Sequence, residues 1–403
     1  MNILYIHQYF KTPREPGATR IYFIVRRLIE AGHRVTVITQ NKKAEINKEL
    51  KIIDGIHIVY IKNAYSNEMS IPMRIKSFFN FMYKASIEAF HHKGIDLVIA
   101  TSTPLSVGLP ALLLKWFKKT PFIFEVRDLW PEVPIQMGGI KNPVIRKIAI
   151  SFEEIIYKNA DHIVALSPGM YDGVVKHVDQ RKVSMIPNMA KKERFWPREK
   201  NSSIIQKLAL RSESFKVIHF GTMGIANGLM YILEAALMLK ETQVQDIDFV
   251  FLGEGKAEKE LKDFKRKNKL TNVFFYDRVP MEMTSEIVNL CDVSLVPFKN
   301  IPILATNSPN KLFDSLAAGK PIIVNSNGWT KTMVEDNECG AYVDPNNPAD
   351  LANLLLDWKQ KPELLRKLGK NSRKLAESTY DESILTKKFV DIVNSLSIAS
   401  RKR

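Results

Sequence analysis

Residues 216–228 read KVIHFGTMGIANG, a short apolar strand that runs directly into a glycine-rich loop. A helical pattern and a second apolar strand follow, so this run predicts a βαβ unit with two parallel strands and a right-handed crossover. Residues 2–39 have the same order of strand, loop, helix and strand. Two such units predict an α/β protein with two Rossmann-like domains, whose parallel sheets face each other across a cleft.

Length and composition agree with two domains. At 403 residues the chain is too long for one ordinary core, and its apolar and charged fractions are those of a globular protein. We expect a first domain over 1–190, a polar and basic linker over 191–213, and a second domain over 214–380. The last helix, from about residue 381 to 403, is expected to pack back on the first domain.

The formal net charge is +16, which favours polyanionic partners such as anionic lipids or phosphorylated ligands. Neither a zinc-finger spacing nor an RNA-binding aromatic signature occurs, so we expect no nucleic-acid partner. The only cysteines, Cys291 and Cys339, form neither a disulfide framework nor a metal-binding spacing. The first residues look like a strand and not a signal peptide, and a cytoplasmic location is therefore expected.

Residues 71–93 combine aromatic and aliphatic residues with Arg74, Lys76, Lys84 and Lys93. Such a basic amphipathic segment is typical of a helix that lies on a membrane surface. An ordinary helix that packs one side on a core would have a similar pattern. Both interpretations stay open on the sequence.

Residues 307–321 read NSPNKLFDSLAAGKP and predict a helix with marked ends. Ser308 suits the N-cap, and Gly319 suits the left-handed position after the last turn. Lys311 beside the helix start suits a phosphate, because free N–H groups and the helix dipole favour an anion there. Asp314, one turn later, suits a sugar hydroxyl. The alternative is a solvated helix with a surface ion pair.

Other candidate residues follow strands, at the edge where parallel sheets bind ligands. His7, Gly17 and Arg20 come after the first strand, and Arg127 and Asp128 come directly after the strand at 122–126. Two charged residues at a strand's carboxyl end are candidates for a catalytic site. The alternative is a structural ion pair between Arg127 and Asp128 or Glu132. His219, within a buried strand, is interpreted as a core histidine.

The ordered set of motifs resembles family 4 glycosyltransferases, which have the two-domain GT-B fold. The resemblance covers nearly the whole chain, and the motifs that carry it lie at residues 16–20, 124–132, 166–170, 186–188, 220–224, 253–255 and 308–314. The string FEVRDLWPE at 124–132 is the most specific. It resembles the branch of amino-deoxysugar transferases for bacterial surface polysaccharides such as O-antigen and capsule, including N-acetyl-L-fucosamine transferases.

The resemblance implies a retaining transfer from a UDP-sugar, with no metal ion and no cofactor besides that substrate. The second domain would bind the nucleotide, and the first domain would bind the acceptor. The implied acceptor is a polyprenyl-diphosphate-linked saccharide. We therefore expect a peripheral enzyme on the inner face of the cell membrane, with an anionic membrane surface as a further partner.

The resemblance also assigns roles to residues of this chain. Arg278 and Val279 would lie at the uracil, and Asp314 would bind the ribose hydroxyls. On the donor side, the residues near the diphosphate or the donor sugar would be Gly17, Gly221, Glu254, Ser308, Asn310 and Lys311. On the acceptor side, the residues would be His7, Arg20, Arg127 and Asp128. Asp128, as orienter or proton acceptor, and Lys311 would carry the catalysis.

Some positions depart from the family pattern. Met223 or Gly224 and Asn227 replace the usual Arg and Lys of the glycine-rich loop, and Thr306 stands where an acid usually lies near the donor sugar. Lys311 would then be the main remaining cation for the phosphates. Two alternatives share the two-domain plan: a UDP-sugar 2-epimerase, and a two-domain binding protein without catalysis.

Overall fold

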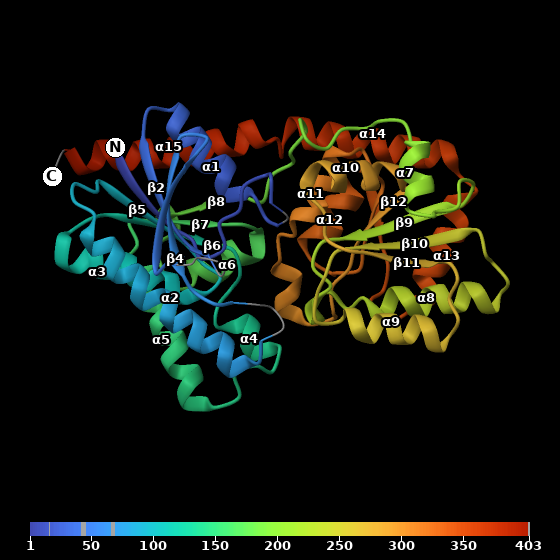
Figure 1. Ribbon diagram of the computed structural model, residues 1–403, viewed down its shortest axis with the longest axis horizontal. Helices are drawn as coiled ribbons and strands as arrows, with labels where there is room; N and C mark the ends of the chain where they lie inside the picture. The colour runs from blue at the N-terminus through green and yellow to red at the C-terminus, as the bar shows by residue number, and fades with distance from the viewer. Residues whose placement is uncertain (16, 42–45, 66–68, 402–403) are drawn as a thin grey trace.

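The computed structural model describes residues 1–15, 17–41, 46–65 and 69–401. Figure 1 shows two α/β domains side by side along the long axis, each built around one sheet. Pro16, the first residue of one family motif, and Lys402 and Arg403 at the end of the chain lie outside the described residues. The prediction of two Rossmann-like domains with parallel sheets is confirmed, with one antiparallel edge strand that it did not include.

The first sheet contains, in the described chain, eight strands in the order β3-β4-β2-β1-β5-β6-β7-β8. Tyr5 in the central strand lies opposite Val37 on one side and Ile99 on the other. The strands are β1 (Asn2–Ile6), β2 (Arg34–Asn41), β3 (Lys48–Ile53), β4 (Ile56–Lys62), β5 (Leu97–Thr101), β6 (Phe122–Val126), β7 (His162–Ala165) and β8 (Val183–Met185).

Helices cover both faces of this sheet, which is why its central strands are apolar on both sides. One face packs on the first helix of the chain, and the other packs on a layer that includes the helix predicted over 71–93. The helices are α1 (Arg20–Glu30), α2 (Ile71–His91), α3 (Gly108–Lys118), α4 (Glu132–Gln136), α5 (Pro143–Asn159) and α6 (Pro168–Val175). In Figure 1, α2, α3 and α5 lie together on the lower side of the first domain.

The strand β3 was missed by the sequence analysis. It pairs antiparallel with β4 through a tight turn at Asp54 and Gly55, whose φ angles are 50° and 79°. Positive φ at both central residues is typical of a type I′ turn, for which Asp-Gly is a favoured pair. The Asp-Gly pair was therefore the signal that could have predicted the hairpin.

The second sheet has the strand order β11-β10-β9-β12-β13-β14, and all its pairs are parallel. Every residue of β9 is buried, because helices cover this sheet on both faces as well. The strands are β9 (Phe215–Phe220), β10 (Ile247–Leu252), β11 (Val273–Tyr276), β12 (Val293–Val296), β13 (Ile322–Val324) and β14 (Gly340–Tyr342).

The helices of the second domain form two layers. Figure 1 shows α8 and α9 below the sheet, with α10, α11 and α14 above it. The helices after the first domain are α7 (Ser202–Lys207), α8 (Met230–Glu241), α9 (Glu258–Lys267), α10 (Met281–Leu290), α11 (Asn310–Ala317), α12 (Trp329–Asp336), α13 (Pro348–Lys359), α14 (Pro362–Ser378) and α15 (Glu382–Arg401). Pro362 stands at the first position of α14 and separates this helix from α13.

The last helix, α15, crosses back over the first domain, as Figure 1 shows in red along the upper edge. It lies against α1, where Arg27 Nε donates to Thr386 Oγ1 and His33 Nε2 lies 3.1 Å from Asn394 Oδ1. Its buried face contributes Phe389 to the core that it shares with α1. Among the helices of the described chain, none is both long and apolar enough to cross a membrane.

Candidate functional site

The two sheets turn their loops toward each other, and side chains join the domains at several points. Ser167 at the start of α6 donates a hydrogen bond to the carbonyl of Thr306 in the second domain. Gln136 at the end of α4 accepts a hydrogen bond from the backbone N–H of Ile303 at 3.0 Å. The candidate site residues of the two domains lie in the loops around these contacts.

Asp128 lies just beyond β6 and accepts a hydrogen bond from Thr103 Oγ1 at 2.8 Å. Burial raises the pKa of the Asp128 carboxyl, while the hydrogen bond from Thr103 and the charge of Arg127 oppose this shift. Thr103 has a φ of 84°, which is strained for a β-branched residue and is held only where its surroundings require it. The sequence analysis did not select Thr103, although it follows a buried strand and precedes a proline.

His7 and Arg127 lie beside Asp128 at the same edge of the sheet. His7 is almost fully buried, and burial together with the nearby Arg127 charge holds its pKa well below the usual value, so the ring is neutral. Burial also lowers the pKa of the Arg127 guanidinium. Within the described residues Arg127 has no ion pair with Asp128 or with Glu132, which contradicts the structural alternative considered above. Its backbone N–H donates to Ser102 Oγ.

Arg20, predicted on the acceptor side, points into the protein interior. Its side chain is 1% exposed and pairs with Glu125, with 2.6 Å between Nε and Oε1. The guanidinium also donates to the carbonyls of Ile186 and Pro187, where the chain leaves the first domain. Glu125 accepts another hydrogen bond from the Tyr5 hydroxyl. The structure thus does not bring Arg20 together with His7, Arg127 and Asp128 as a group that faces a ligand.

On the second domain, Lys311 lies beneath the glycine-rich loop. A Cβ built on Gly221 would lie 3.5 Å from Lys311 Cε, and Lys311 Nζ lies 3.3 Å from His219 Nε2. Burial lowers the pKa of Lys311 to about 7 and, with the Lys311 charge, keeps the pKa of His219 well below its usual value. Across the described chain no carboxylate pairs with Lys311. His219 is buried in β9, as a core histidine would be.

The start of α11 differs from the prediction. Ser308 is not the N-cap; α11 begins at Asn310 after Pro309, with no side-chain cap. Ser308 instead meets the first domain, since its hydroxyl accepts from the backbone N–H of Asn188 and its carbonyl accepts from Asn188 Nδ2 at 2.5 Å. The other end of the helix is as expected, because Gly319 has a φ of 62°.

Asp314 does not lie open to the cleft. Its carboxylate pairs with Lys191 of the first-domain side, with 2.5 Å between Oδ1 and Nζ, and both side chains are nearly buried. Burial raises the pKa of Asp314, and Lys191 opposes this shift. The surface ion pair between Lys311 and Asp314 that the spacing permits is absent from the ion pairs of the described residues. The sequence analysis missed Lys191, because it lay in a stretch interpreted as a linker.

Two glycines make the turns after β9 and β10 possible. Gly253 has a φ of 145°, and a Cβ there would lie 1.9 Å from the carbonyl oxygen of Gly221, so no larger residue fits. Glu254 follows with an exposed side chain, and its carbonyl accepts from the backbone N–H of Met223. On the first domain Gly17 is exposed, with a φ of 140°.

Thr306, which replaces the family's usual acid, is part of the domain contact. Its hydroxyl donates to the carbonyl of Ile303 at 2.7 Å, and a Cβ on Gly169 would lie 2.7 Å from Thr306 Cγ2. The start of α6 therefore packs directly on this threonine, and a longer acidic side chain would need space that Gly169 and its neighbours occupy.

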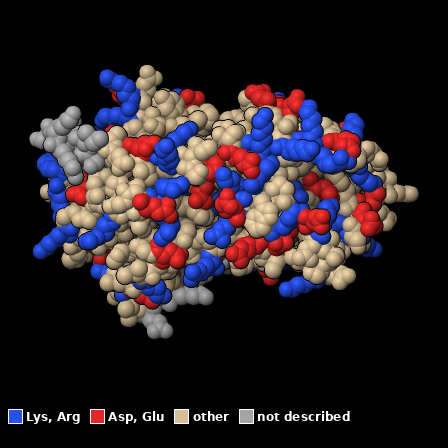
Figure 2. All heavy atoms as spheres, turned by 90° about the horizontal axis from the view of Figure 1, so that it is seen from above, with Lys and Arg blue, Asp and Glu red and all other residues tan. Residues whose placement is uncertain are grey.

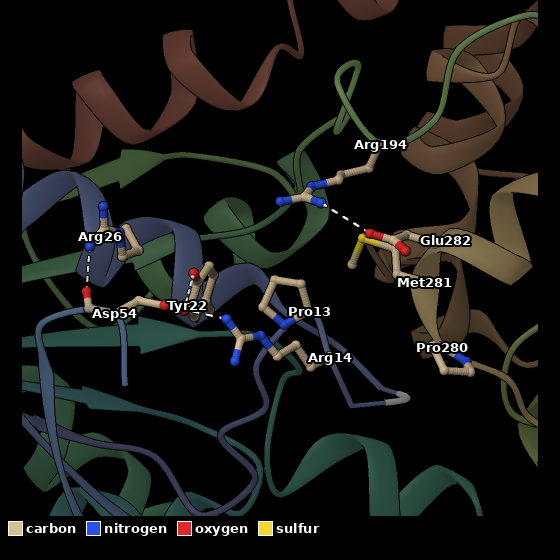
Figure 3. A pocket seen from close by; sticks show the side chains of 9 residues that line it. All are labelled: Pro13, Arg14, Tyr22, Arg26, Asp54, Arg194, Pro280, Met281 and Glu282. Atoms are coloured by element: carbon tan, nitrogen blue, oxygen red, sulfur yellow. Dashed lines mark hydrogen bonds and ion pairs between the residues drawn. The ribbon is translucent and has the colours of Figure 1, made fainter. Parts of the chain in front are cut away.

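A pocket of about 670 Å³ lies between the domains, beyond the loop after β11 (Figure 3). Its lining residues are Pro13, Arg14, Tyr22, Arg26, Asp54, Arg194, Pro280, Met281 and Glu282. Arg278 and Val279, which are half-buried, come directly before the pocket residue Pro280. In Figure 3, Arg194 reaches across to Glu282 of the second domain. The described residues contain no group of three His, Cys, Asp or Glu side chains that could hold a metal ion.

The structure thus forms two clusters from the predicted residues. His7, Arg127 and Asp128, with Thr103, lie on the first domain, and Gly221 and Lys311 lie on the second. A neutral imidazole, a carboxyl and an arginine suit binding of a polar ligand, and a lysine beside a glycine turn suits an anion. Arg20, Ser308 and Asp314 are instead held by contacts within the protein.

The comparisons with known proteins agree with this arrangement. Residues 17–194 match the family described as Glycosyltransferase Family 4, and residues 200–375 match the family described as Glycosyl transferases group 1. A putative teichuronic acid biosynthesis glycosyltransferase of Bacillus subtilis is 26% identical over 251 residues, which are 60% of this chain and 59% of that protein.

A second relative is named as the UDP-Gal:alpha-D-GlcNAc-diphosphoundecaprenol alpha-1,3-galactosyltransferase of Escherichia coli. It is 25% identical over 204 residues, which are 49% of this chain and 50% of that protein. The match therefore spans about half the length of this relative. Among solved structures, an Anabaena protein in complex with UDP and glucose superimposes with a TM-score of 0.74 at 16% identity, covering 98% of this chain and 99% of that chain.

The position of Arg20 leads to a stability prediction. Replacing Arg20 with Met leaves the Glu125 carboxylate buried without its partner, and we expect the free energy of unfolding to fall by about 3–5 kcal/mol. Urea denaturation followed by fluorescence measures this change. Arg14→Met, at a side chain that is 81% exposed, is the matched control and should change stability by less than about 0.5 kcal/mol. Equal stability of the two variants, with activity lost only in Arg20→Met, would contradict a structural role.

Proposed function

This chain belongs to the glycosyltransferases that join a family 4 domain to a group 1 domain in the GT-B fold, and on that premise we propose that it transfers a sugar from a UDP-sugar to a saccharide acceptor. The observation that carries the proposal is Lys311, a cation in the first turn of α11 that has no carboxylate partner in the described chain. Asp128 on the first domain supplies the facing polar group.

In this proposal Lys311 binds the diphosphate of the donor. The ammonium lies next to Gly221, where the missing side chain lets a phosphate approach the backbone closely. As the bond between the sugar and the diphosphate breaks, negative charge gathers on the leaving oxygen. A fixed cation and backbone N–H groups stabilise this charge as it develops, which lowers the barrier without a metal ion. We propose Arg278 and Val279 as contacts of the base.

The acceptor enters from the first domain. Its hydroxyl oxygen forms the new bond to the anomeric carbon as the bond to the diphosphate breaks, and its proton passes to the departing diphosphate oxygen. Asp128, which the hydrogen bond from Thr103 holds in one orientation, positions that hydroxyl. Retention of the anomeric configuration follows from the family resemblance and requires that acceptor and leaving group use the same face of the sugar.

We further propose a lipid-linked saccharide as the acceptor, in surface-polysaccharide synthesis. The Escherichia coli relative is named for an acceptor linked through a diphosphate to undecaprenol, and the Bacillus subtilis relative is named for teichuronic acid biosynthesis. The motif at 124–132 supports an N-acetylated amino- or deoxy-sugar as the transferred group.

A membrane surface is proposed as the place of action. On its solvent side α2 exposes five large apolar side chains, Met73, Ile75, Phe79, Tyr83 and Ile87. Arg74, Lys76 and Lys84 lie among them, and no acidic residue precedes Glu88 in this helix. Figure 2 shows a different pattern on the face seen from above, which carries α14 and α15: there Lys and Arg alternate with Asp and Glu.

The first turns of α5 carry a second group of exposed apolar side chains. Val144, Ile145 and Ile148 are more than half exposed, and Arg146 and Lys147 stand between them. An apolar face among basic residues is the composition that binds the interface of an anionic bilayer. The inner side of α2 packs on the sheet through Phe81 and Ala85, as the core-packing alternative predicted, and we propose the membrane role for its outer side.

The test of the proposed activity is a donor screen. Purified protein is incubated with UDP-N-acetylglucosamine and other UDP-sugars, with and without a bacterial extract of lipid-linked saccharides, and products are identified by mass spectrometry. We expect a saccharide lengthened by one sugar only when the extract is present. An epimeric UDP-sugar formed without extract would indicate the 2-epimerase alternative, and UDP-sugar binding without any turnover would indicate a binding protein.

The role of Lys311 leads to a pH-dependent prediction. Its pKa of about 7 means that the ammonium loses its proton as pH rises through 7, so affinity for UDP should fall between pH 7 and 9, by at most about tenfold per pH unit. Lys311→Met should weaken UDP binding by about ten- to a hundredfold at pH 7 and remove this pH dependence.

Isothermal titration calorimetry with UDP at several pH values measures both effects. Lys320→Met is a matched control, since burial lowers the pKa of Lys320 to about 8 as well, but its ammonium donates to the carbonyls of Asn289 and Cys291 away from the glycine turn. If Lys311→Met bound UDP as tightly as the unmodified protein, the phosphate site would have to lie elsewhere.

Membrane binding is tested by flotation with vesicles. We expect the protein to bind vesicles that contain phosphatidylglycerol, to bind neutral vesicles less, and to bind less at high salt, because salt screens the electrostatic part. Phe79→Glu should weaken binding, whereas Met238→Glu, at a partly exposed position of α8 in the second domain, should not. Failure to bind anionic vesicles at any salt concentration would refute this role.

A further inference from the structure

Four aromatic side chains pack in a row between the loops at the cleft and α2. The Tyr9 ring lies 4.9 Å from Tyr65, the Tyr65 ring stacks on Phe78 at 5.6 Å, and the Phe78 ring meets Trp130 at 6.4 Å between centroids. All four residues are half-buried, so each ring keeps part of its surface accessible. The four side chains come from the loops after β1, β4 and β6 and from α2, and we call them the aromatic wall.

The inner end of the aromatic wall belongs to the candidate site. Tyr9 meets His7 edge to face at 6.3 Å, and Trp130 follows Asp128 by two residues. The middle of the wall includes Phe78 of α2, the helix whose exposed side carries Phe79. The wall thus lies beside the candidate site and is built in part on the helix that is proposed to face a membrane.

A cation accompanies the wall. The Arg74 guanidinium lies over the Tyr65 ring, 5.8 Å from its centroid, and it is close enough to Tyr9 to affect the pKa of that phenol. The Nε atom of Arg74 is buried and has no hydrogen-bond partner among the residues that the structure describes. No Asp or Glu in the described residues lies within ion-pair distance of Arg74. A buried donor without a partner is costly, and a bound anion would remove this cost.

From this geometry we propose that Arg74 and the aromatic wall form the binding site for a diphosphate-linked amphiphilic acceptor. Its diphosphate binds Arg74, its apolar chain lies on the exposed side of α2, and its sugar rings stack on the aromatic wall toward Asp128. Aromatic faces bind the apolar faces of sugar rings, and arginine forms paired hydrogen bonds with phosphate oxygens. This inference rests on the proposed transferase function and adds the acceptor subsite to it.

The test measures binding of two synthetic probes by isothermal titration calorimetry, in the presence of UDP. One probe is N-acetylglucosaminyl diphosphate esterified with an undecyl chain, and the other is undecyl N-acetylglucosaminide, which lacks the diphosphate. Arg74→Gln should weaken binding of the diphosphate probe by about ten- to a hundredfold and leave the glycoside unaffected. Lys259→Gln, at an exposed lysine of α9 in the second domain, is the control and should change neither.

A second pair of variants tests the aromatic wall. Phe78→Leu removes a stacking ring and should weaken both probes by about two- to tenfold, whereas Phe79→Leu on the exposed side should change binding less. Circular dichroism and the thermal midpoint check that each variant is folded.

Three results would overturn the proposal: no binding of the diphosphate probe to the unmodified protein, an equal loss in Arg74→Gln and Lys259→Gln, or an equal loss of both probes in Arg74→Gln. UDP binding is measured separately in each sample. A protein that binds UDP but not the diphosphate probe would refute this acceptor subsite alone, whereas absence of UDP binding would refute the proposed function.

Discussion

The buried pair between Arg20 and Glu125 is the constraint on which the first domain depends. A guanidinium in a protein interior must be matched by a carboxylate and by further acceptors, because an unpaired buried charge is unfavourable by several kcal/mol. Here the partners come from two parts of the chain: Glu125 from β6, and the carbonyls of Ile186 and Pro187 from the segment by which the chain leaves the domain. Satisfying one side chain therefore fixes the start of α1 and the end of β6, and with them the loops that carry Asp128.

The same exit segment also determines the position of the second domain. Directly after the two carbonyls bound by Arg20, Asn188 holds Ser308, and Lys191 pairs with Asp314 of α11. One short stretch is thus bound by the first domain through Arg20 and binds the helix that carries Lys311. These hydrogen bonds and ion pairs connect the two candidate clusters of the cleft. A substitution that removes one of these contacts is therefore expected to shift the side chains of both clusters.

The cations of this protein divide into two kinds. Arg20 and Lys191 each pair with a buried carboxylate and serve the structure. Lys311, Arg127 and Arg74 lie half-buried in or near the cleft, and the described residues provide no carboxylate for any of them. Partial burial lowers the pKa of Lys311 and makes an anionic ligand the natural partner. The net positive charge of the sequence does not tell which cations pair within the protein and which lack a carboxylate partner.

The sequence by itself determined the fold, because apolar strands and glycine-rich turns recur in order and their periods are local properties of the chain. It also placed Asp128 shortly after a strand and Lys311 at the start of a helix. The glycine that ends α11, Gly319, was predicted from the local sequence in the same way. What only the tertiary structure decided is which charged residues are available to a ligand. Arg20, Ser308 and Asp314 have partners 105, 120 and 123 residues away in the chain, and no local pattern carries that information. Thr103 and the aromatic wall were missed for the same reason, since their meaning comes from contacts across the sheet and between helices.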